Sequence, residues 1–254
     1  MGKIIILGTA NAIPAEGHEN THLFIRHGER IILVDCAANP VPHLSKAGVD
    51  INHVYDLILT HFHPDHVSGV PLLLMDMWLM GRKQDLTIYG LEHTLSRLQT
   101  LMDLYEWKTW PNFYPVHFKI QPEYELAPLI EENDVRIFSS PVKHLLPTIG
   151  IRVEFSEKGS SAAYSSDTEP TDVVVRLAQG VDVLIHEATG ASLGHSSAGQ
   201  AGEIAQKARA KSLYLVHYPT QASIDDLIRQ AKTTYTGPVW VAKDFMEIEI
   251  GKSR

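Results

Sequence analysis

Segment 60–66 concentrates side chains that bind divalent metal ions. Four of its residues carry imidazole or carboxylate groups: His61, His63, Asp65 and His66. The segment follows the apolar run Asp56–Leu59 and precedes a helix-like pattern, and a strand that ends in a turn lets alternate side chains point to one place beyond a sheet. Imidazole nitrogens and carboxylate oxygens are the ligands that zinc takes in open, catalytic sites. The alternative interpretation is a histidine-rich surface turn.

The number of ligand-type residues in this segment predicts two metal ions. Four such residues exceed what one tetrahedral ion with an open position draws from one loop. Pro64 and the absence of a cysteine ligand argue against a structural zinc finger. Two ions about 3.5–4 Å apart share a water and generate hydroxide near neutral pH. We therefore expect a binuclear metal-dependent hydrolase with zinc, or alternatively manganese or iron.

The rest of the sequence predicts strands and helices in both halves of the chain. Runs rich in Ile, Val, Leu and Tyr, bounded by Gly, Pro, Asn and Asp, predict strands at 4–10, 23–27, 30–35, 56–60, 87–90, 135–139, 148–155, 162–165, 181–187, 212–217 and 239–250. Helical periodicity appears at 67–80, 91–107, 171–179, 198–210 and 224–231. Without strict βαβ alternation, this mixture predicts sheets packed on each other with helices outside. No linker divides the chain, so we expect one domain, residues 1–254.

Composition limits the classes of protein and substrate. No apolar run approaches the roughly 20 residues that span a bilayer, so no membrane segment is expected. Cys36 is the one cysteine, which excludes an internal disulfide and favours a cytoplasmic location. The net charge is −8, and lysines and arginines do not cluster. Nucleic-acid-binding surfaces are usually basic, so this charge counts against a large polyanionic substrate.

Several further segments, in this order along the chain, resemble one protein family. They are Leu7–Pro14, Tyr164–Thr168, His186–Thr189, His195–Ala198 and Leu215–His217. Together with His-x-His-x-Asp-His after a strand, they make the chain similar to the metallo-β-lactamase superfamily, and within it to the ribonuclease Z branch. The resemblance implies an α/β fold, an αββα sandwich of two mixed sheets flanked by helices, in which a metal-bridging hydroxide attacks a phosphodiester.

The resemblance also assigns roles to residues. One metal is held by His61, His63 and His144, the other by Asp65, His66 and His217, and Asp167 bridges them. Asp65 also counts as catalytic. His195 is the implied proton donor with Glu187 as its orienting partner, and the alternative is a histidine near a helix cap. Asp35 either orients a ligand imidazole or caps a turn, and His186 is expected to be structural.

Departures from the family bear on the substrate. The tRNA-processing members carry a long arm, placed in bacterial members between the positions of His144 and Asp167, and here the expected strands fill that interval. The missing arm and the acidic charge favour a small or cyclic phosphodiester over tRNA. The alternatives are a hydrolase of another ester-type bond (lactone, thioester, carboxylic or sulfate ester), a tRNA 3′-end endonuclease, or a non-hydrolytic metal-binding or redox protein.

An aromatic stretch, Trp107–Phe118, has no counterpart elsewhere in the chain. It forms a buried loop, a subunit contact or a substrate-facing wall. With the Met-rich segment Met75–Met80 it offers more apolar surface than one domain usually needs, so we expect a homodimer.

Overall fold

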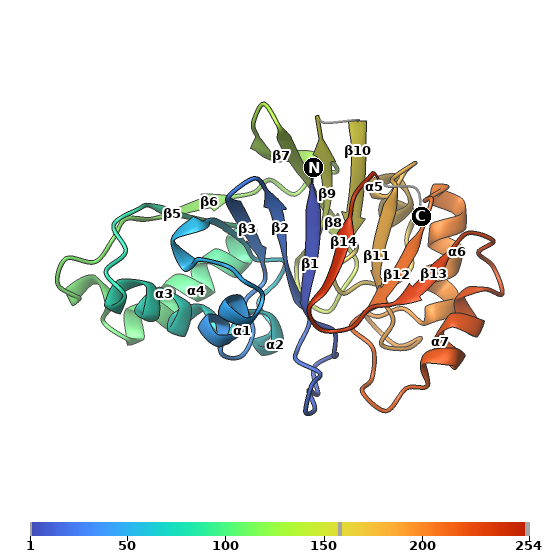
Figure 1. The fold of residues 1–254 in the computed structure, drawn as a ribbon, viewed down its shortest axis with the longest axis horizontal. Helices are drawn as coiled ribbons and strands as arrows, with labels where there is room; N and C mark the ends of the chain where they lie inside the picture. Colours follow the sequence, from blue (N-terminus) through green and yellow to red (C-terminus); the bar gives the residue numbers. More distant parts are fainter. Residues whose placement is uncertain (1, 157–158, 252–254) are drawn as a thin grey trace.

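A computed structural model describes residues 2–156 and 159–251. The described residues form two seven-stranded sheets that pack face to face, with helices on both outer faces (Figure 1). Helices α1 to α4 lie on one side of the sandwich and α5 to α7 on the other. The expected αββα sandwich of two mixed sheets is therefore confirmed.

The first sheet carries the N-terminal half and the last strand. Its order is β14 (Met246–Glu249), β1 (Lys3–Gly8), β2 (His22–His27), β3 (Arg30–Val34), β4 (Val54–Ile58), β5 (Leu86–Gly90) and β6 (Val116–Ile120). Strands β14 to β3 pair antiparallel, and β3 to β6 pair parallel. The loops that follow β3 and β4 therefore lie at the same edge of the sheet.

The second sheet repeats this arrangement. Its order is β13 (Val239–Val241), β12 (Leu213–Val216), β11 (Val183–Glu187), β10 (Ser160–Tyr164), β9 (Thr148–Phe155), β8 (Val135–Val142) and β7 (Ala127–Glu131). Strands β10 to β13 pair parallel and β7 to β10 antiparallel. Because two antiparallel steps separate β8 from β10, the ends of β8, β10, β11 and β12 share one edge.

Alternation along the strands builds three apolar layers. On β1, Ile4 and Ile6 enter the core between the sheets, whereas Ile5 and Leu7 face the helices on the outer side. That outer layer packs against α1 (Pro40–Lys46), α3 (Val70–Leu79) and α4 (Glu92–Leu104). The opposite outer layer packs against α5 (Asp172–Leu177), α6 (Ala198–Ala208) and α7 (Ile224–Ala231). The shared central layer supports our proposal that residues 1–254 form one domain.

Several elements differ from the prediction. Helix α1 and strands β6 and β7 were not expected, because α1 contains two prolines, and β6 and β7 contain exposed or proline positions suited to sheet edges. The expected run 239–250 divides into β13 and β14, which belong to different sheets. The chain changes sheets at 242–245, where Phe245 has a φ of 65°. The expected helix 67–80 also divides, into α2 (Pro64–Val67) and α3.

In the part of the chain that the structure describes, no helix has the length and apolar character needed to cross a bilayer.

Candidate metal centre

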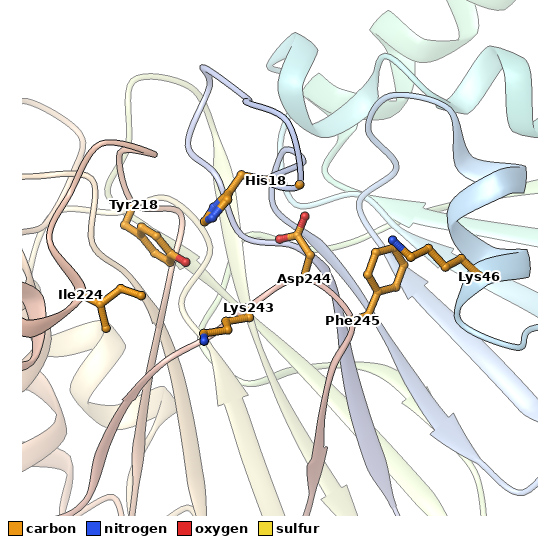
Figure 2. A pocket seen from close by; sticks show the side chains of 8 residues that line it. His18, Lys46, Tyr218, Ile224, Lys243, Asp244 and Phe245 are labelled. Atoms are coloured by element: carbon orange, nitrogen blue, oxygen red, sulfur yellow. The ribbon is translucent and has the colours of Figure 1, made fainter.

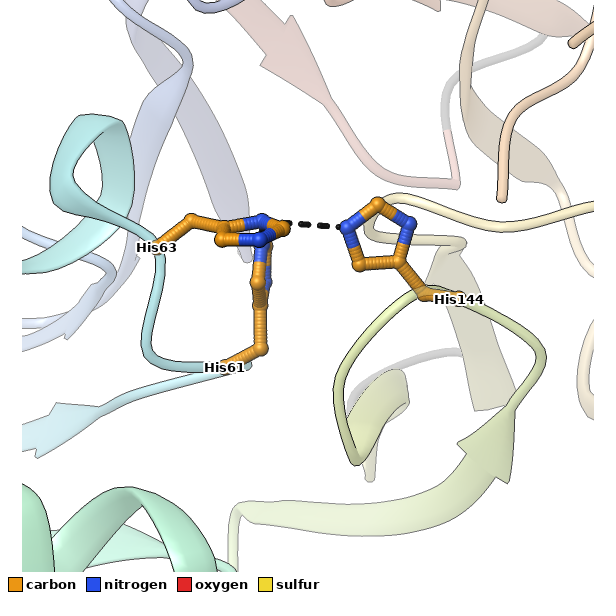
Figure 3. A group of neighbouring side chains, drawn as sticks. All are labelled: His61, His63 and His144. Carbon is orange, nitrogen blue, oxygen red and sulfur yellow. Dashed lines mark hydrogen bonds between the residues drawn. The ribbon is translucent and has the colours of Figure 1, made fainter. Parts of the chain in front are cut away.

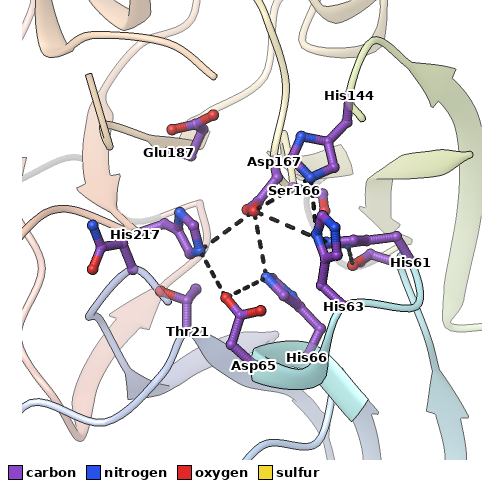
Figure 4. A network of polar contacts seen from close by, with 12 residues as sticks. Thr21, His61, His63, Asp65, His66, His144, Ser166, Asp167, Glu187 and His217 are labelled. Carbon is purple, nitrogen blue, oxygen red and sulfur yellow. Dashed lines mark hydrogen bonds and ion pairs between the residues drawn. The ribbon is translucent and has the colours of Figure 1, made fainter. Parts of the chain in front are cut away.

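The predicted ligands meet at the edge where parallel strands end. Loop 59–66 follows β4, and His144 follows β8; Asp167 and His217 follow β10 and β12. Figure 4 shows these side chains pointing toward one another, with Asp167 in the middle. Side chains at the carboxyl ends of parallel strands converge in this way because the strands point to a common edge.

Three imidazoles form a first group. Nδ1 of His63 lies 3.0 Å from Nε2 of His61 and 3.1 Å from Nε2 of His144 (Figure 3). His61 is fully buried, whereas His63 and His144 are half-buried. Three nitrogens at this separation present their lone pairs to one point, as three ligands of a single divalent ion do.

A second group surrounds Asp65. Nε2 of His66 and Nε2 of His217 each lie 3.5 Å from Oδ2 of Asp65. The Oδ2 atom of Asp167 lies 3.5 Å from His66 Nε2 and 3.4 Å from His217 Nε2. The same oxygen is 3.9 Å from His61 Nε2, in the first group. One carboxylate oxygen thus stands between the two groups.

Buried atoms without hydrogen bonds test whether these residues fit metal ions. Within residues 2–156 and 159–251, His66 Nε2, His217 Nε2 and Asp167 Oδ1 are buried and have no hydrogen-bond partner. Each orphaned buried group costs about 1–3 kcal/mol. His66 Nε2 and His217 Nε2 both face Asp65 and Asp167, and imidazole nitrogens with carboxylate oxygens are the ligands that zinc takes, so these residues fit divalent cations.

Each of these imidazoles has a second ring nitrogen that faces away from the ligand groups. Hydrogen bonds to these outer nitrogens fix the rings. Asp35 accepts a hydrogen bond from His66 Nδ1 at 2.8 Å and another from Thr60 Oγ1 at 2.8 Å. Because the Thr60 hydroxyl donates to Asp35, it accepts from His61 Nδ1, 3.0 Å away. Asp35 therefore supports one imidazole from each group, and it also accepts from the backbone N–H of Thr60. Both of the roles considered for Asp35 are present in its contacts.

The imidazoles of His144 and His217 are held in the same manner. His144 Nδ1 donates to the carbonyl oxygen of Gly194 at 2.7 Å. The hydroxyl of Thr189 donates to the His217 carbonyl and accepts from His217 Nδ1 at 2.7 Å. Outer-ring partners of this kind orient metal-binding imidazoles and set their tautomer. The sequence analysis gave no role to Thr60, Thr189 or Gly194, although Thr60 and Thr189 lie within segments that it singled out and Gly194 lies next to one.

Left-handed backbone turns aim the ligands. Asp35, Ser166 and His217 have φ values of 58°, 55° and 50°. Such conformations cost roughly 1–2 kcal/mol per residue when a side chain is present. All three occur where a strand ends at the centre, and strained backbone of this kind clusters at functional sites.

Charge in the centre favours a cation. Burial opposes ionisation of Asp167, but the imidazoles of His217 and His66 outweigh it and hold the pKa of its carboxyl well below the usual range. Burial and the neighbouring His66 lower the pKa of His61 well below 6.5, so its imidazole is neutral and able to bind a metal. Asp65 stays ionised, because the imidazoles of His217 and His66 outweigh burial and lower its pKa.

His195 and Glu187 lie beside the ligand groups. Nδ1 of His195 donates to Oε1 of Glu187 at 3.0 Å, and the His195 ring centroid lies 4.9 Å from that of His144. Glu187 is completely buried and also accepts backbone hydrogen bonds from Thr168, Thr189 and Ser196. His195 borders a cavity of about 480 Å³ whose lining includes Leu193. The His195 ring thus has one nitrogen fixed by Glu187, which leaves Nε2 as its second proton-carrying atom.

Two other sequence expectations concern residues outside the centre. His186 is buried, and its Nδ1 donates to the Glu187 carbonyl, so it lies within the structure rather than in the ligand groups. In the aromatic stretch, Trp107 and Tyr114 are buried in the layer between the first sheet and its helices. Trp110 stacks on Trp78 with ring centroids 5.0 Å apart. These contacts match the buried-loop interpretation.

The fold and the centre together define a metal-dependent hydrolase of the metallo-β-lactamase fold. A family model described as a beta-lactamase superfamily domain matches residues 30–218, and the chain belongs to this family. The resemblance inferred from the ligand segment is thereby confirmed.

Individual relatives and solved structures are similar to nearly the whole chain. Ribonuclease Z of Methanothermobacter thermautotrophicus is 27% identical, with 98% of this chain and 97% of that protein covered. That alignment runs over 305 positions, although this chain has 254 residues, so the relative contains segments without a counterpart here. The crystal structure of the short form of human tRNase Z superimposes with a TM-score of 0.78 at 25% identity, covering 98% and 100% of the two chains. The metallo-beta-lactamase fold protein YhfI from Bacillus subtilis gives 0.84 at 24% identity, covering 97% and 98%.

Proposed function

We propose that the protein is a binuclear metal-dependent phosphodiesterase of ribonuclease Z-like type. The observation that carries this proposal is the Glu187–His195 pair, held by a 3.0 Å hydrogen bond beside the two ligand groups. An ester with a poor leaving group needs a proton at the leaving oxygen, and a fixed imidazole can deliver one. The similarity to ribonuclease Z proteins supports the same reaction class.

Seven residues would hold the ions. His61, His63 and His144 would bind one ion, Asp65, His66 and His217 the other, and Asp167 would contact both. Two bound divalent ions, which we propose to be zinc with manganese or iron as alternatives, would activate a water and stabilise charge on the phosphate. Asp65 would also act in catalysis, because its ionised carboxylate faces the same space as Asp167 and can orient the attacking water.

The chain's own proton donor is His195. Burial disfavours its charged form, but the hydrogen bond and the charge of Glu187 outweigh burial and raise the pKa of His195 above its ordinary value. The ring is therefore protonated over a wider pH range than a free imidazole. With Nδ1 donating to Glu187, the Nε2 proton is the one available to a leaving oxygen.

The short β9–β10 connection supports a small or cyclic phosphodiester as the substrate. Strands β9 and β10 pair directly, with Phe155 opposite Ser160, so residues 156–159 alone join them. No arm is inserted at this position, and the net charge of −8 disfavours a large polyanion. A tRNA 3′-end endonuclease is the second candidate, and it is favoured by the ribonuclease Z relatives, two of which are covered over 97% and 100% of their length. Hydrolysis of another ester-type bond remains an alternative outcome of the test.

Activity on substrates of different size tests the proposal. Metal-loaded protein is assayed on bis(p-nitrophenyl) phosphate, a cyclic nucleotide, a lactone, a thioester, a sulfate ester and a precursor tRNA. We expect turnover of the small diesters to far exceed tRNA cleavage, with metal analysis giving two ions per chain. Efficient removal of the tRNA 3′ trailer at physiological salt would favour the endonuclease. Activity confined to the non-phosphate esters would contradict the phosphodiesterase assignment.

A further inference from the structure

A second cavity, of about 410 Å³, lies beside the loop that joins β1 to β2 (Figure 2). It is lined by Gly17, His18, Lys46, Tyr218, Ile224, Lys243, Asp244 and Phe245. None of these residues belongs to the ligand groups of the metal centre. The cavity is nevertheless adjacent to the metal centre in the sequence, because Tyr218 directly follows His217.

Backbone contacts connect the cavity wall to the metal centre. The loop residue Ala10 forms bridges with both Asn20 and Tyr218. The N–H of Tyr218 donates to the carbonyl of Thr9 at 3.3 Å, and the His18 ring meets the Tyr218 ring edge-on. The loop between β1 and β2 is therefore attached to the strand end that carries His217. A molecule in the cavity would contact Tyr218, the residue next to His217.

Two lysines give the cavity positive charge. In the part of the chain that the structure describes, neither Lys46 nor Lys243 forms an ion pair with a carboxylate. Nζ of Lys46 lies 4.1 Å from the centre of the Phe245 ring, and this contact holds the ammonium group in place. The ring of His43 also stacks on Phe245. Phe245 therefore contacts two residues of α1, His43 and Lys46, and anchors the Lys46 side chain at the cavity.

The carboxylate in the cavity wall is already engaged. Oδ1 of Asp244 accepts a hydrogen bond from the Thr9 hydroxyl at 2.6 Å, and Oδ2 accepts from the backbone N–H of Glu19 at 2.8 Å. Both oxygens thus bind the β1–β2 loop, and neither lysine is paired with them. The cations remain available to a ligand that carries negative charge.

We propose that this cavity binds a phosphate group. Two ammonium groups in its lining match the charge of a dianionic phosphate, and lysine binds phosphate as a point charge. The phosphate can come from two sources: a second phosphate on a linear substrate whose diester lies at the metal centre, or free inorganic phosphate. The first source rests on the proposed function and makes the substrate a short, linear phosphodiester with an additional phosphate rather than a cyclic mononucleotide.

The binding test requires no turnover. Inorganic phosphate is titrated by calorimetry into metal-loaded wild type, the Lys46→Gln/Lys243→Gln variant and the control Lys119→Gln. Lys119 is a matched control, because it is exposed like Lys46 and Lys243 and its ammonium group also lies over an aromatic ring, that of Tyr89. Lys119 belongs to the edge strand β6. We expect wild type and the control to bind one more phosphate per chain than the double variant. Equal stoichiometry and affinity in all three proteins would overturn the proposal.

A kinetic comparison identifies the source of the phosphate. The p-nitrophenyl ester of thymidine 5′-phosphate is compared with the same ester carrying a 3′-phosphate. If the cavity takes a substrate phosphate, the added group lowers KM about tenfold in wild type and in the control, and the double variant loses this advantage. Extra phosphate binding without a KM effect would assign the cavity to free phosphate and overturn the substrate-phosphate source. If wild type hydrolyses neither ester, the proposed function fails, and the titration still decides whether the cavity binds phosphate.

Discussion

Glu187 accepts a hydrogen bond from Nδ1 of His195 at 3.0 Å while its own side chain is completely buried. Three backbone N–H groups hold the same carboxylate. The carboxylate is therefore fixed before any substrate arrives, and it fixes the imidazole in turn. Preorganised donors of this kind cost little reorganisation during a reaction. The role proposed for His195 follows from this arrangement and leads to two predictions.

The first prediction is that the effect of His195→Ala depends on the leaving group. On a diester with a poor leaving group, we expect kcat to fall about 10²–10⁴-fold, because no proton reaches the departing alkoxide. On p-nitrophenyl esters the loss shrinks, since p-nitrophenolate leaves without a proton. Both metal ions should remain bound, as metal analysis would show. An equal loss on both substrates would mean that His195 positions the substrate instead.

The second prediction concerns pH and Glu187→Gln. His195 acts as an acid when protonated, and its pKa is raised by Glu187, so the rate on a poor leaving group should decline only above the ordinary range of histidine. Glu187→Gln removes the negative charge, so the decline should move to lower pH. The variant should also be less stable, because its amide NH₂ would face the N–H of Thr189. A pH–rate profile that is identical in both proteins would contradict the assignment of the proton donor.

The residues of the metal centre were easier to predict from the sequence than the connections between strands. The ligand segment 61–66 is local, so its spacing alone indicates metal chemistry, whereas His144, Asp167 and His217 required the family resemblance because the sheet brings them together. The division of 239–250 between two sheets could not be read from the sequence. Lys243 and Asp244 interrupt the apolar residues where the chain turns at Phe245, but a polar pair alone does not show that the strands on either side of it belong to different sheets.

The third prediction concerns assembly. With Trp107 and Tyr114 buried, the exposed apolar side chains near this region lie at the ends of α3 and α4: Leu79, Met80, Leu104 and Tyr105, each more than half exposed. We expect this surface to pair in a homodimer that forms at micromolar concentration. Light scattering should give twice the mass of one chain, and Leu79→Glu with Leu104→Glu should give a monomer. A monomeric wild type would contradict this prediction.

The fourth prediction tests Asp35 as a support for two imidazoles. His66 Nδ1 and the Thr60 hydroxyl both donate to Oδ2 of Asp35, and the Thr60 backbone N–H donates to Oδ1. Asn has one acceptor oxygen, so in Asp35→Asn its NH₂ group faces either the two side-chain donors or the Thr60 N–H. We expect metal affinity to fall about 10–100-fold, as for other outer-ring partners of metal-binding histidines. Competition with a chelator measures this affinity. As a matched control, Asp50→Asn removes a carboxylate that caps the short helix at 51–53 and should leave metal affinity unchanged. Equal affinities in the two variants would assign Asp35 to turn capping alone.

The fifth prediction separates the bridging carboxylate from the proton donor. Oδ2 of Asp167 lies within 4 Å of His61, His66 and His217, so it contacts both ligand groups. Asp167→Ala should lose metal together with activity, because nothing then offsets the repulsion between two divalent ions in a buried space. Asp167→Asn keeps the shape but removes the charge, and it should retain at most one ion per chain by elemental analysis. His195→Ala is the control, since it should keep two ions while losing activity on poor leaving groups. If Asp167→Ala retained two ions, the bridging role would be wrong, and the ion separation would have to be set by Asp65.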